Sequence, residues 1–391
     1  MKLQKEKIII VLTVLIDVLG LGIIIPVLPF YVESFGASAI TLTLLFSVFS
    51  LFSFVSGPFL GALSDRIGRR PVLIISILST AIGWFVFASA HAIWVLFLGR
   101  IIDGMAAGNL PIAQSYLVDI ARDDKERTSN LGIIGAIFGI GFIVGPAIGG
   151  ALSSVSHSLP FFFVGGLATL NVIGAFFFLP ETHKHLDKQK KMALNPLRPL
   201  TNAVRDKLLL SRYIAWFFFG ISISAMQSVF ALYMGRVFGF GVTMVGAAYT
   251  AMGLAVLINQ AILLRNFWLK YFSEASLEVW AFLSNAIGLA LLMGPSVYFL
   301  ICGIVFHVFS HSLLRVVMTS RAAGIAGHLR RGEVLGIMSS VLSLAMIGGP
   351  LLAGSLFEIK PFLPFAACSL ALASGFLIMK YYSAEIVADK G

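Results

Sequence analysis

The chain has 391 residues, of which 58% are hydrophobic and only 12% are charged, and 34 are phenylalanine. The mean hydropathy of +0.95 excludes an ordinary soluble protein and indicates a polytopic membrane protein. The net charge of +10 would suggest a nucleic-acid partner for a soluble protein, but the placement of Lys and Arg in a membrane protein explains it, and we expect none.

Twelve apolar runs are each long enough to cross a bilayer, which takes about 20 helical residues. The first run contains Asp17 and Pro26 and ends without a small-residue cleavage site, so it is predicted to be a membrane span rather than a signal peptide. The predicted spans are 8–30, 41–63, 72–90, 93–119, 130–154, 160–180, 213–235, 242–264, 276–294, 296–320, 333–356 and 361–382. The sequence therefore predicts an all-α membrane protein with twelve transmembrane helices.

The spans form two sets of six, separated by a long polar segment. This pattern predicts an N-terminal half over 1–180, a basic cytoplasmic linker over 181–212, part of it a surface helix, and a C-terminal half over 213–391. If the N-terminus is cytoplasmic, only Arg236 and Lys360 among the Lys and Arg residues fall in outside loops. This asymmetry predicts that both termini are cytoplasmic.

A short charged turn, GALSDRIGRR, joins the second and third spans. Its glycines permit close helix approach and a tight reversal, and its acid offers a negative partner to the nearby basic groups. The pattern G-x-x-x-D-R-x-G-R-R resembles the signature turn of the major facilitator superfamily. The resemblance implies two six-helix halves with a substrate cavity between them near the bilayer midplane. It rests on Gly61, Asp65, Arg66, Gly68, Arg69 and Arg70.

A glycine-rich pattern, G-x-x-x-G-P-x-x-G-G, lies in the fifth span. Small residues at this spacing let helices pack closely and proline bends the helix, so ordinary packing is one interpretation. The full pattern is similar to the motif of drug:proton antiporters within the superfamily. That resemblance implies a role as hinge and seal for Gly141, Gly145, Pro146 and Gly149.

Three ionisable residues lie deep in the first and fourth spans. A charge at this depth costs roughly 2.5–3.5 kcal/mol on insertion scales, so it marks a functional site by default. Asp17 and Asp103 are expected at the same level, about 14–15 Å from the membrane surface. Arg100 lies one helical turn from Asp103 and can pair with either carboxylate. We predict that the three residues couple transport to protons, the alternative being an ion pair that only locks helices together.

The first and fourth spans also resemble antiporter motifs around Asp17 and Arg100, and the branch of greatest similarity is the tetracycline-efflux-like group. Tetracycline exporters carry an acid in the middle of the third span, where this chain has Gly83 beside Trp84. We therefore expect an antiporter without tetracycline specificity.

In the tenth span, His307, His311 and Arg315 recur at every fourth position and share one helix face. They form a relay or substrate-binding stripe, or else they satisfy helix contacts while the arginine reaches the cytoplasmic surface. Two histidines without a third ligand do not predict a metal site.

Other polar and large side chains near the midplane are candidates for a loosely selective, mostly apolar substrate cavity. Each amide can equally form a hydrogen bond between helices. The candidates are Trp84, Asn109, Gln114, Met226, Gln227, Asn259, Gln260 and Asn285.

The sequence thus favours a proton-coupled antiporter that exports a lipophilic small molecule, works without a cofactor as a monomer, and lies in a bacterial inner membrane. A proton-coupled importer and a non-transporting membrane sensor or partner are the alternatives. Motifs of metalloproteases and serine hydrolases are absent from the sequence, so no enzyme is predicted.

Overall fold

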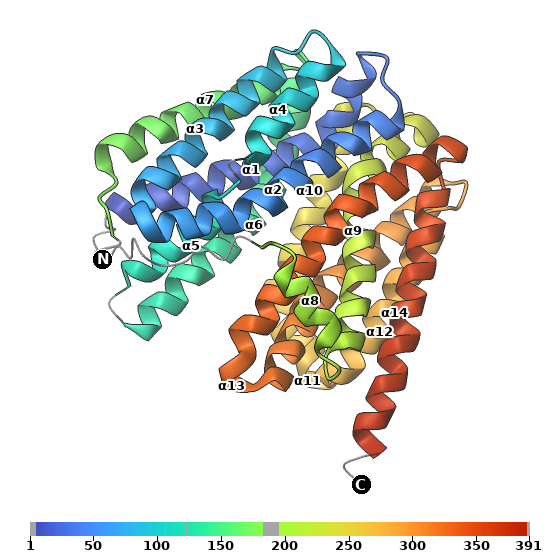
Figure 1. Cartoon of the computed structure of the whole chain (residues 1–391). Coiled ribbons are helices and arrows are strands. Elements are labelled where there is room, and N and C mark those ends of the chain that lie inside the picture. The colour runs from blue at the N-terminus through green and yellow to red at the C-terminus, as the bar shows by residue number, and fades with distance from the viewer. Residues whose placement is uncertain (1–4, 106, 122, 183–194, 389–391) are drawn as a thin grey trace. The chain divides into compact units, whose positions relative to one another are not determined.

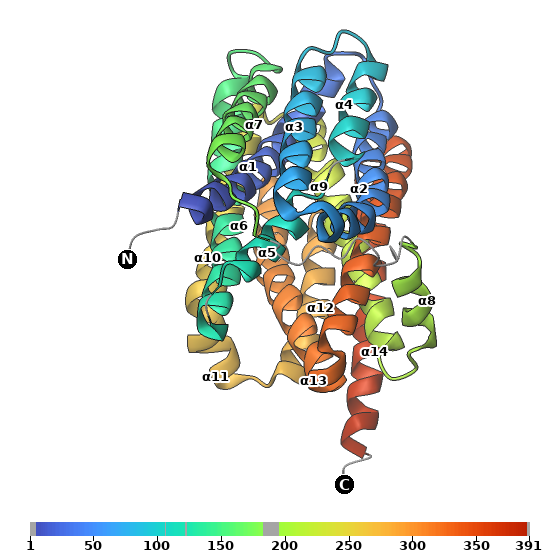
Figure 2. The ribbon, with the colours of Figure 1, turned by 60° about the vertical axis from the view of Figure 1, so that its left-hand side comes forward.

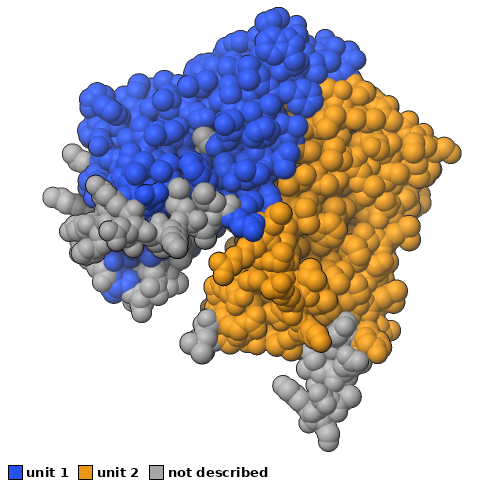
Figure 3. All heavy atoms as spheres, in the orientation of Figure 1, with its two compact units in different colours: residues 1–37, 48–196, 240–250 blue, residues 38–47, 197–239, 251–391 orange. Residues whose placement is uncertain are grey.

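A computed structural model describes residues 5–105, 107–121, 123–182 and 195–388, and every regular element within them is a helix (Figure 1). The chain divides into two compact units (Figure 3). Unit 1 comprises Met1–Ala37, Val48–Pro196 and Phe240–Thr250, and unit 2 comprises Ser38–Ser47, Leu197–Gly239 and Ala251–Gly391. Each unit therefore includes one short segment from the opposite half of the sequence, which the division at a linker over 181–212 does not anticipate.

Unit 1 is built mainly from the helices of the first six predicted spans. Prolines lie inside α1 and α6, where the lack of one backbone donor is tolerated among neighbouring membrane helices. The helices are α1 (Lys5–Glu33), most of α2 (Ala39–Ile67), α3 (Arg69–Ala88), α4 (Ile93–Met105), α5 (Asn109–Asp119), α6 (Asp124–Ser153), α7 (Leu159–Phe178) and the first part of α10 (Val242–Ile258).

Unit 2 holds most of the helices of the second half of the sequence, together with the first turns of α2 and the last part of α10. The short helix α8 lies within the predicted linker, of which 183–194 fall outside the described residues. After α10 the chain continues as a π-helix, η1. The elements are α8 (Arg198–Arg205), α9 (Leu210–Phe238), η1 (Asn259–Trp268), α11 (Leu269–Tyr271), α12 (Glu274–Leu291), α13 (Val297–Ile359) and α14 (Leu363–Ala388).

The predicted fourth span is interrupted between α4 and α5 (Figure 2). Gly108 precedes the second segment without a side-chain cap, and Pro111 occupies its first turn, where no intrahelical N–H bond is lost. The interruption places Asn109 at the first position of α5, so its amide lies at a helix end in the interior of the unit.

The predicted tenth and eleventh spans are joined in α13 through a kink. Gly327 has φ 70° and ψ 176°, a conformation that only glycine adopts readily. It separates the two membrane-length segments Val297–Gly327 and Arg330–Ile359. The reversal between these spans therefore needs almost no loop.

Eleven helical segments of the described residues are long and apolar enough to cross a membrane. Twelve spans are predicted, and the ninth of them corresponds to α12, which is not among these eleven segments. It has only 18 residues, two of which, Glu274 and Glu278, are acidic.

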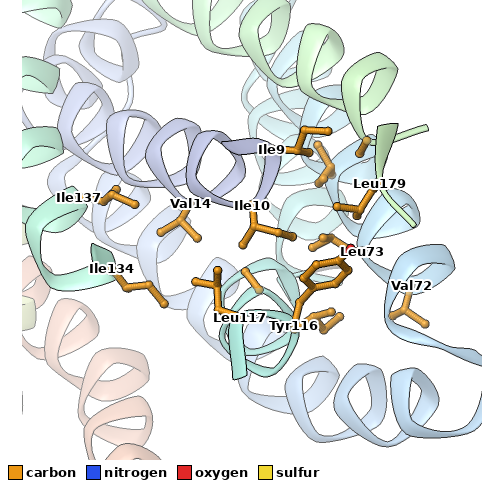
Figure 4. Close-up of a cluster of buried hydrophobic side chains, with 14 of the residues drawn as sticks. Ile9, Ile10, Val14, Val72, Leu73, Tyr116, Leu117, Ile134, Ile137 and Leu179 are labelled. Atoms are coloured by element: carbon orange, nitrogen blue, oxygen red, sulfur yellow. The ribbon is translucent and has the colours of Figure 1, made fainter. Parts of the chain in front are cut away.

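A cluster of buried apolar side chains joins α1, α3, α5 and α6 in unit 1 (Figure 4). Ile10, Tyr116 and Leu117 are completely buried within it, and the Tyr116 hydroxyl donates to the Pro180 carbonyl at 2.8 Å. Because lipid is as apolar as these side chains, their shape complementarity, rather than escape from water, holds the helices together. The cluster ties α5, and with it Asn109, to α1.

Candidate functional site

Asn109 and Thr80 lie between the two predicted carboxylates of unit 1. Asn109 Nδ2 donates to Asp17 Oδ1 at 3.0 Å and lies 3.2 Å from Thr80 Oγ1, to which it also donates. The Thr80 side chain in turn lies beside the Asp103 carboxylate. We call Asp17, Asn109, Thr80, Asp103 and Arg100 the carboxylate network. The sequence predicts Asn109 as a substrate-cavity residue and carries no local signal for Thr80.

Arg100 pairs with Asp103, one of the two partners that its position on the helix allowed. Arg100 Nη2 lies 3.7 Å from Asp103 Oδ2, and the two residues are only 4% and 7% exposed. Its guanidinium carbon lies 4.8 Å and 4.9 Å from the ring centroids of Trp84 and Phe87. These aromatic faces offset part of the cost of burying the cation.

The network leaves two polar atoms without hydrogen-bond partners among the described residues. They are Arg100 Nε and Asn109 Oδ1, both fully shielded from solvent. Buried polar atoms without partners are costly, and they concentrate where a structure performs chemistry or changes state. The network is therefore not a fully satisfied structural lock.

Close packing of α3 against α4 shapes the wall of the network. A Cβ atom at Gly83 would lie 3.0 Å from both Cβ and N of Asp103, and one at Gly99 would lie 2.9 Å from the Gly83 carbonyl oxygen. An acidic side chain at position 83 would thus require α3 and α4 to separate. The space for a third-span acid is filled here by the backbone that carries Asp103.

The glycine-rich motif of the fifth span packs α6 directly against α1. A Cβ atom at Gly145 would lie 2.8 Å from Cα of Gly22, and one at Gly22 would lie 2.6 Å from the Gly141 oxygen. Gly149 similarly faces Ile23 at 3.2 Å. The Pro146 carbonyl faces the start of α10 within the same unit, where a Cβ atom at Gly246 would lie 2.7 Å from it. The motif thus contacts the helix that carries Asp17.

The charged turn between α2 and α3 is held by residues from other helices. Arg69 Nη1 lies 2.6 Å from Asp65 Oδ1, and Arg69 Nε lies 3.3 Å from Asp119 Oδ2. The Glu181 carboxylate accepts from the backbone N–H groups of Arg69 and Arg70, both at 3.0 Å, and so caps the start of α3. Asp119 and Glu181 escaped the sequence analysis because no local pattern links them to the turn.

Two glycines of this turn differ in how much space a side chain would have. Gly68 has φ 108°, and a Cβ atom there would collide with the Glu181 carboxylate, so this position requires glycine. Nothing lies within 4 Å of a Cβ atom at Gly61. The expected close helix approach is therefore wrong at Gly61, because this face of α2 has open space around it.

The two other arginines of the turn are also partly enclosed by the unit. Arg66 is partly buried, and Arg70 Nη2 donates to the Phe176 carbonyl at 2.7 Å.

In unit 2, the predicted polar residues fall into buried and exposed groups. Asn285 and His307 are buried and bonded, with 2.8 Å between Asn285 Oδ1 and His307 Nδ1. Asn259 is also buried, donates to Ser312 Oγ at 2.5 Å, and accepts from Trp268 across the π-helix. The other candidates do not share one location. In α9, Met226 is buried and Gln227 is half-buried. Gln260 of η1 is exposed, and so is Gln114 of α5 in unit 1.

A buried ion cluster in unit 2 was missed because Glu278 lies near the end of a predicted span. Its carboxylate is completely buried and pairs with both Arg212 of α9 and Arg321 of α13. It therefore joins three helices at one point. The available signal was that the two arginines are expected at the same membrane face as the glutamate.

The family model described as the Major Facilitator Superfamily matches residues 10–272. The chain belongs to the Major Facilitator Superfamily. This match confirms the family that the charged turn resembles. It also confirms the predicted all-α fold class and the prediction of a transporter rather than an enzyme. This superfamily member is a multi-pass membrane transporter.

Curated relatives of this superfamily member match it over nearly its whole length. The quinolone resistance protein NorA of Staphylococcus aureus is 30% identical over 381 residues, which cover 96% of each chain. The class C tetracycline resistance protein of Escherichia coli is 27% identical over 363 residues, which cover 91% of each.

Solved structures of other transporters share the fold of this superfamily member. The nucleoside transporter NupG has a TM-score of 0.79 at 16% identity and covers 95% of this chain and 99% of its own. The human organic anion transporter MFSD10 has a TM-score of 0.71 at 23% identity and covers 96% and 99%.

Proposed function

We propose that the protein is a proton-coupled antiporter that exports a lipophilic, drug-like or toxic small molecule by alternating access. Membership of the superfamily and the full-length similarity to proteins named for quinolone and tetracycline resistance support this function. The observation that carries the proton coupling is the carboxylate network, in which the buried Asp103 pairs with Arg100 and the partly buried Asp17 accepts a hydrogen bond from a neutral amide.

The two carboxylates of the network differ in what balances their charge. Asp103 has Arg100 beside it, whereas Asp17 accepts a hydrogen bond from the neutral amide of Asn109. A carboxylate in a poorly solvated site is stabilised by a cation or by protonation. We therefore assign proton binding to Asp17 and charge compensation to the Arg100–Asp103 pair, with Asn109 and Thr80 linking the two.

The other predicted residues take supporting roles in this proposal. The glycine motif on α6 gives α1 a close and smooth packing surface, and the charged turn holds the ends of α2 and α3 together. The substrate-cavity candidates other than Asn109 keep their predicted role as contacts to the exported molecule. We further propose a monomer in a lipid bilayer, in a bacterial inner membrane, with both termini in the cytoplasm.

Tetracycline remains outside the proposed substrates, although one relative is named for resistance to it. An acid at position 83 would meet the backbone of α4, as shown by the 3.0 Å distance to Asp103 N. A metal–tetracycline chelate would therefore lack a carboxylate ligand at that position.

The direct test is proton movement in proteoliposomes that hold an acidic interior and a pH-sensitive dye. Antiport predicts that adding a transported lipophilic compound outside makes the interior more alkaline, because protons leave as the compound enters. Acidification on addition of the compound would establish symport instead. No response to any of a panel of dyes, lipophilic cations and antibiotics would contradict the proposed function.

A further inference from the structure

A row of basic side chains runs from the interior to the surface of unit 2 along the first segment of α13. His307 is 5% exposed, His311 is partly exposed, and Arg315 is exposed. Their spacing of four residues keeps them on one face of the helix. The row therefore offers an accessible guanidinium and imidazole backed by a buried imidazole.

The buried end of the row is held in a fixed position. Gly288 lets α12 approach closely, since a Cβ atom there would lie 2.8 Å from the backbone N of His307. Asn285, one turn away on α12, bonds the His307 ring at 2.8 Å. The His311 ring stacks between His307 and Phe219, with centroid distances of 5.4 Å and 5.3 Å. Packing on both faces fixes the orientation of His311.

One donor in this cluster is unused. Asn285 Nδ2 is completely buried and has no hydrogen-bond partner among the described residues. A buried amide hydrogen without an acceptor is costly, and an incoming acceptor group would recover that cost, directly or after the amide and ring reorient.

The cluster also lacks a negative charge. No ion pair of the described residues includes Arg315, and the acid of α12, Glu278, is already shared by Arg212 and Arg321. Two further ion pairs within the described residues of the unit join Arg330 to Asp206 and to Glu333. Among the described residues of α9, α12 and α13, no carboxylate therefore forms an ion pair with Arg315, His307 or His311.

We propose that His311 and Arg315, supported by His307 and Asn285, form a subsite for a carboxylate of the transported molecule. Building on the proposed export function, this subsite makes amphipathic organic acids and zwitterions substrates of the protein. A planar carboxylate matches the guanidinium fork, and an imidazole beside it supplies a further donor.

The test uses two dyes that differ only in this group: a rhodamine with a free carboxylate and its methyl ester. Uptake of each into proteoliposomes is measured for the wild type, for Arg315→Gln and for His311→Gln. We expect at least a tenfold loss of acid transport in Arg315→Gln, with transport of the ester within about twofold of the wild type. Arg315→Lys should recover part of the acid transport, because it restores the charge without the fork.

Matched controls are Arg265→Gln, an exposed arginine of η1, and His157→Gln, an exposed histidine of unit 1. Both should transport the two dyes like the wild type. Equal loss of both dyes in Arg315→Gln and His311→Gln would overturn the subsite, because it would indicate a structural role. Wild-type transport of the ester but not of the acid would overturn the subsite while leaving the export function standing.

Discussion

At the scale of single residues, the role we assign to each acid within the helices depends on whether a cationic side chain lies beside it. Asp103 and Glu278 are both buried, and each lies beside arginine. Asp17 instead receives an amide hydrogen bond, which orients the carboxylate without neutralising it. This difference between partners, rather than depth in the membrane alone, is the reason we propose Asp17 as the proton-binding group.

Replacing Asn109 with alanine tests the link between the two carboxylates. We expect proton-coupled export to fall by about tenfold or more, because a hydrogen bond to a charged group contributes about 1.5–3 kcal/mol. The measurement is substrate-dependent proton flux in proteoliposomes, with Ser115→Ala on the same helix as the control. Flux of Asn109→Ala equal to that of the control would remove Asn109 from the coupling path.

Two glycines of the charged turn should respond in opposite ways to alanine. Gly68→Ala forces a side chain into a positive-φ position against Glu181 and should destabilise the protein by about 1–2 kcal/mol or more. Gly61→Ala fills open space within α2 and should stabilise it by about 0.5–1 kcal/mol. Melting temperatures of the purified variants in detergent check the signs, and a higher value for Gly68→Ala would refute the cap geometry.

At the scale of elements, breaks in regular helix determine where the polar groups of the candidate site lie and where one span ends and the next begins. The gap between α4 and α5 puts Asn109 at a helix start beside Asp17, and Gly327 divides α13 into two spans. Glycines at the α1–α6 contact bring the two backbones close together. These features depend on packing between distant segments.

Gly145→Ala tests the α1–α6 contact. The added methyl group would lie 2.8 Å from the Gly22 backbone, which cannot rotate away, so we expect a loss of about 1–3 kcal/mol in stability and a marked loss of transport. Gly135→Ala on the same helix meets nothing within 4 Å and serves as the control. Thermal unfolding and transport are measured together, and indistinguishable behaviour of the two variants would contradict the role given to this contact.

At the scale of the whole molecule, apolar run length was sufficient to predict the all-α class and the twelve spans, since a membrane helix must satisfy its own backbone and match the bilayer. The partners of the functional groups were not predictable in the same way. Asp119, Glu181 and Glu278 meet residues that are distant in sequence, and only the folded chain brings them together. The exchange of 38–47 and 240–250 between the units likewise has no local signal.

The most direct measurement of proton coupling compares two modes of transport in the Asp17→Asn variant. One is exchange of labelled for unlabelled substrate without a pH gradient, and the other is uptake driven by a pH gradient. Glu274→Gln, an exposed acid at the start of α12, is the control. We expect Asp17→Asn to keep exchange and to lose the gradient-driven uptake. Gradient-driven uptake at the wild-type level, or loss of exchange together with uptake, would contradict the assignment of the proton to Asp17.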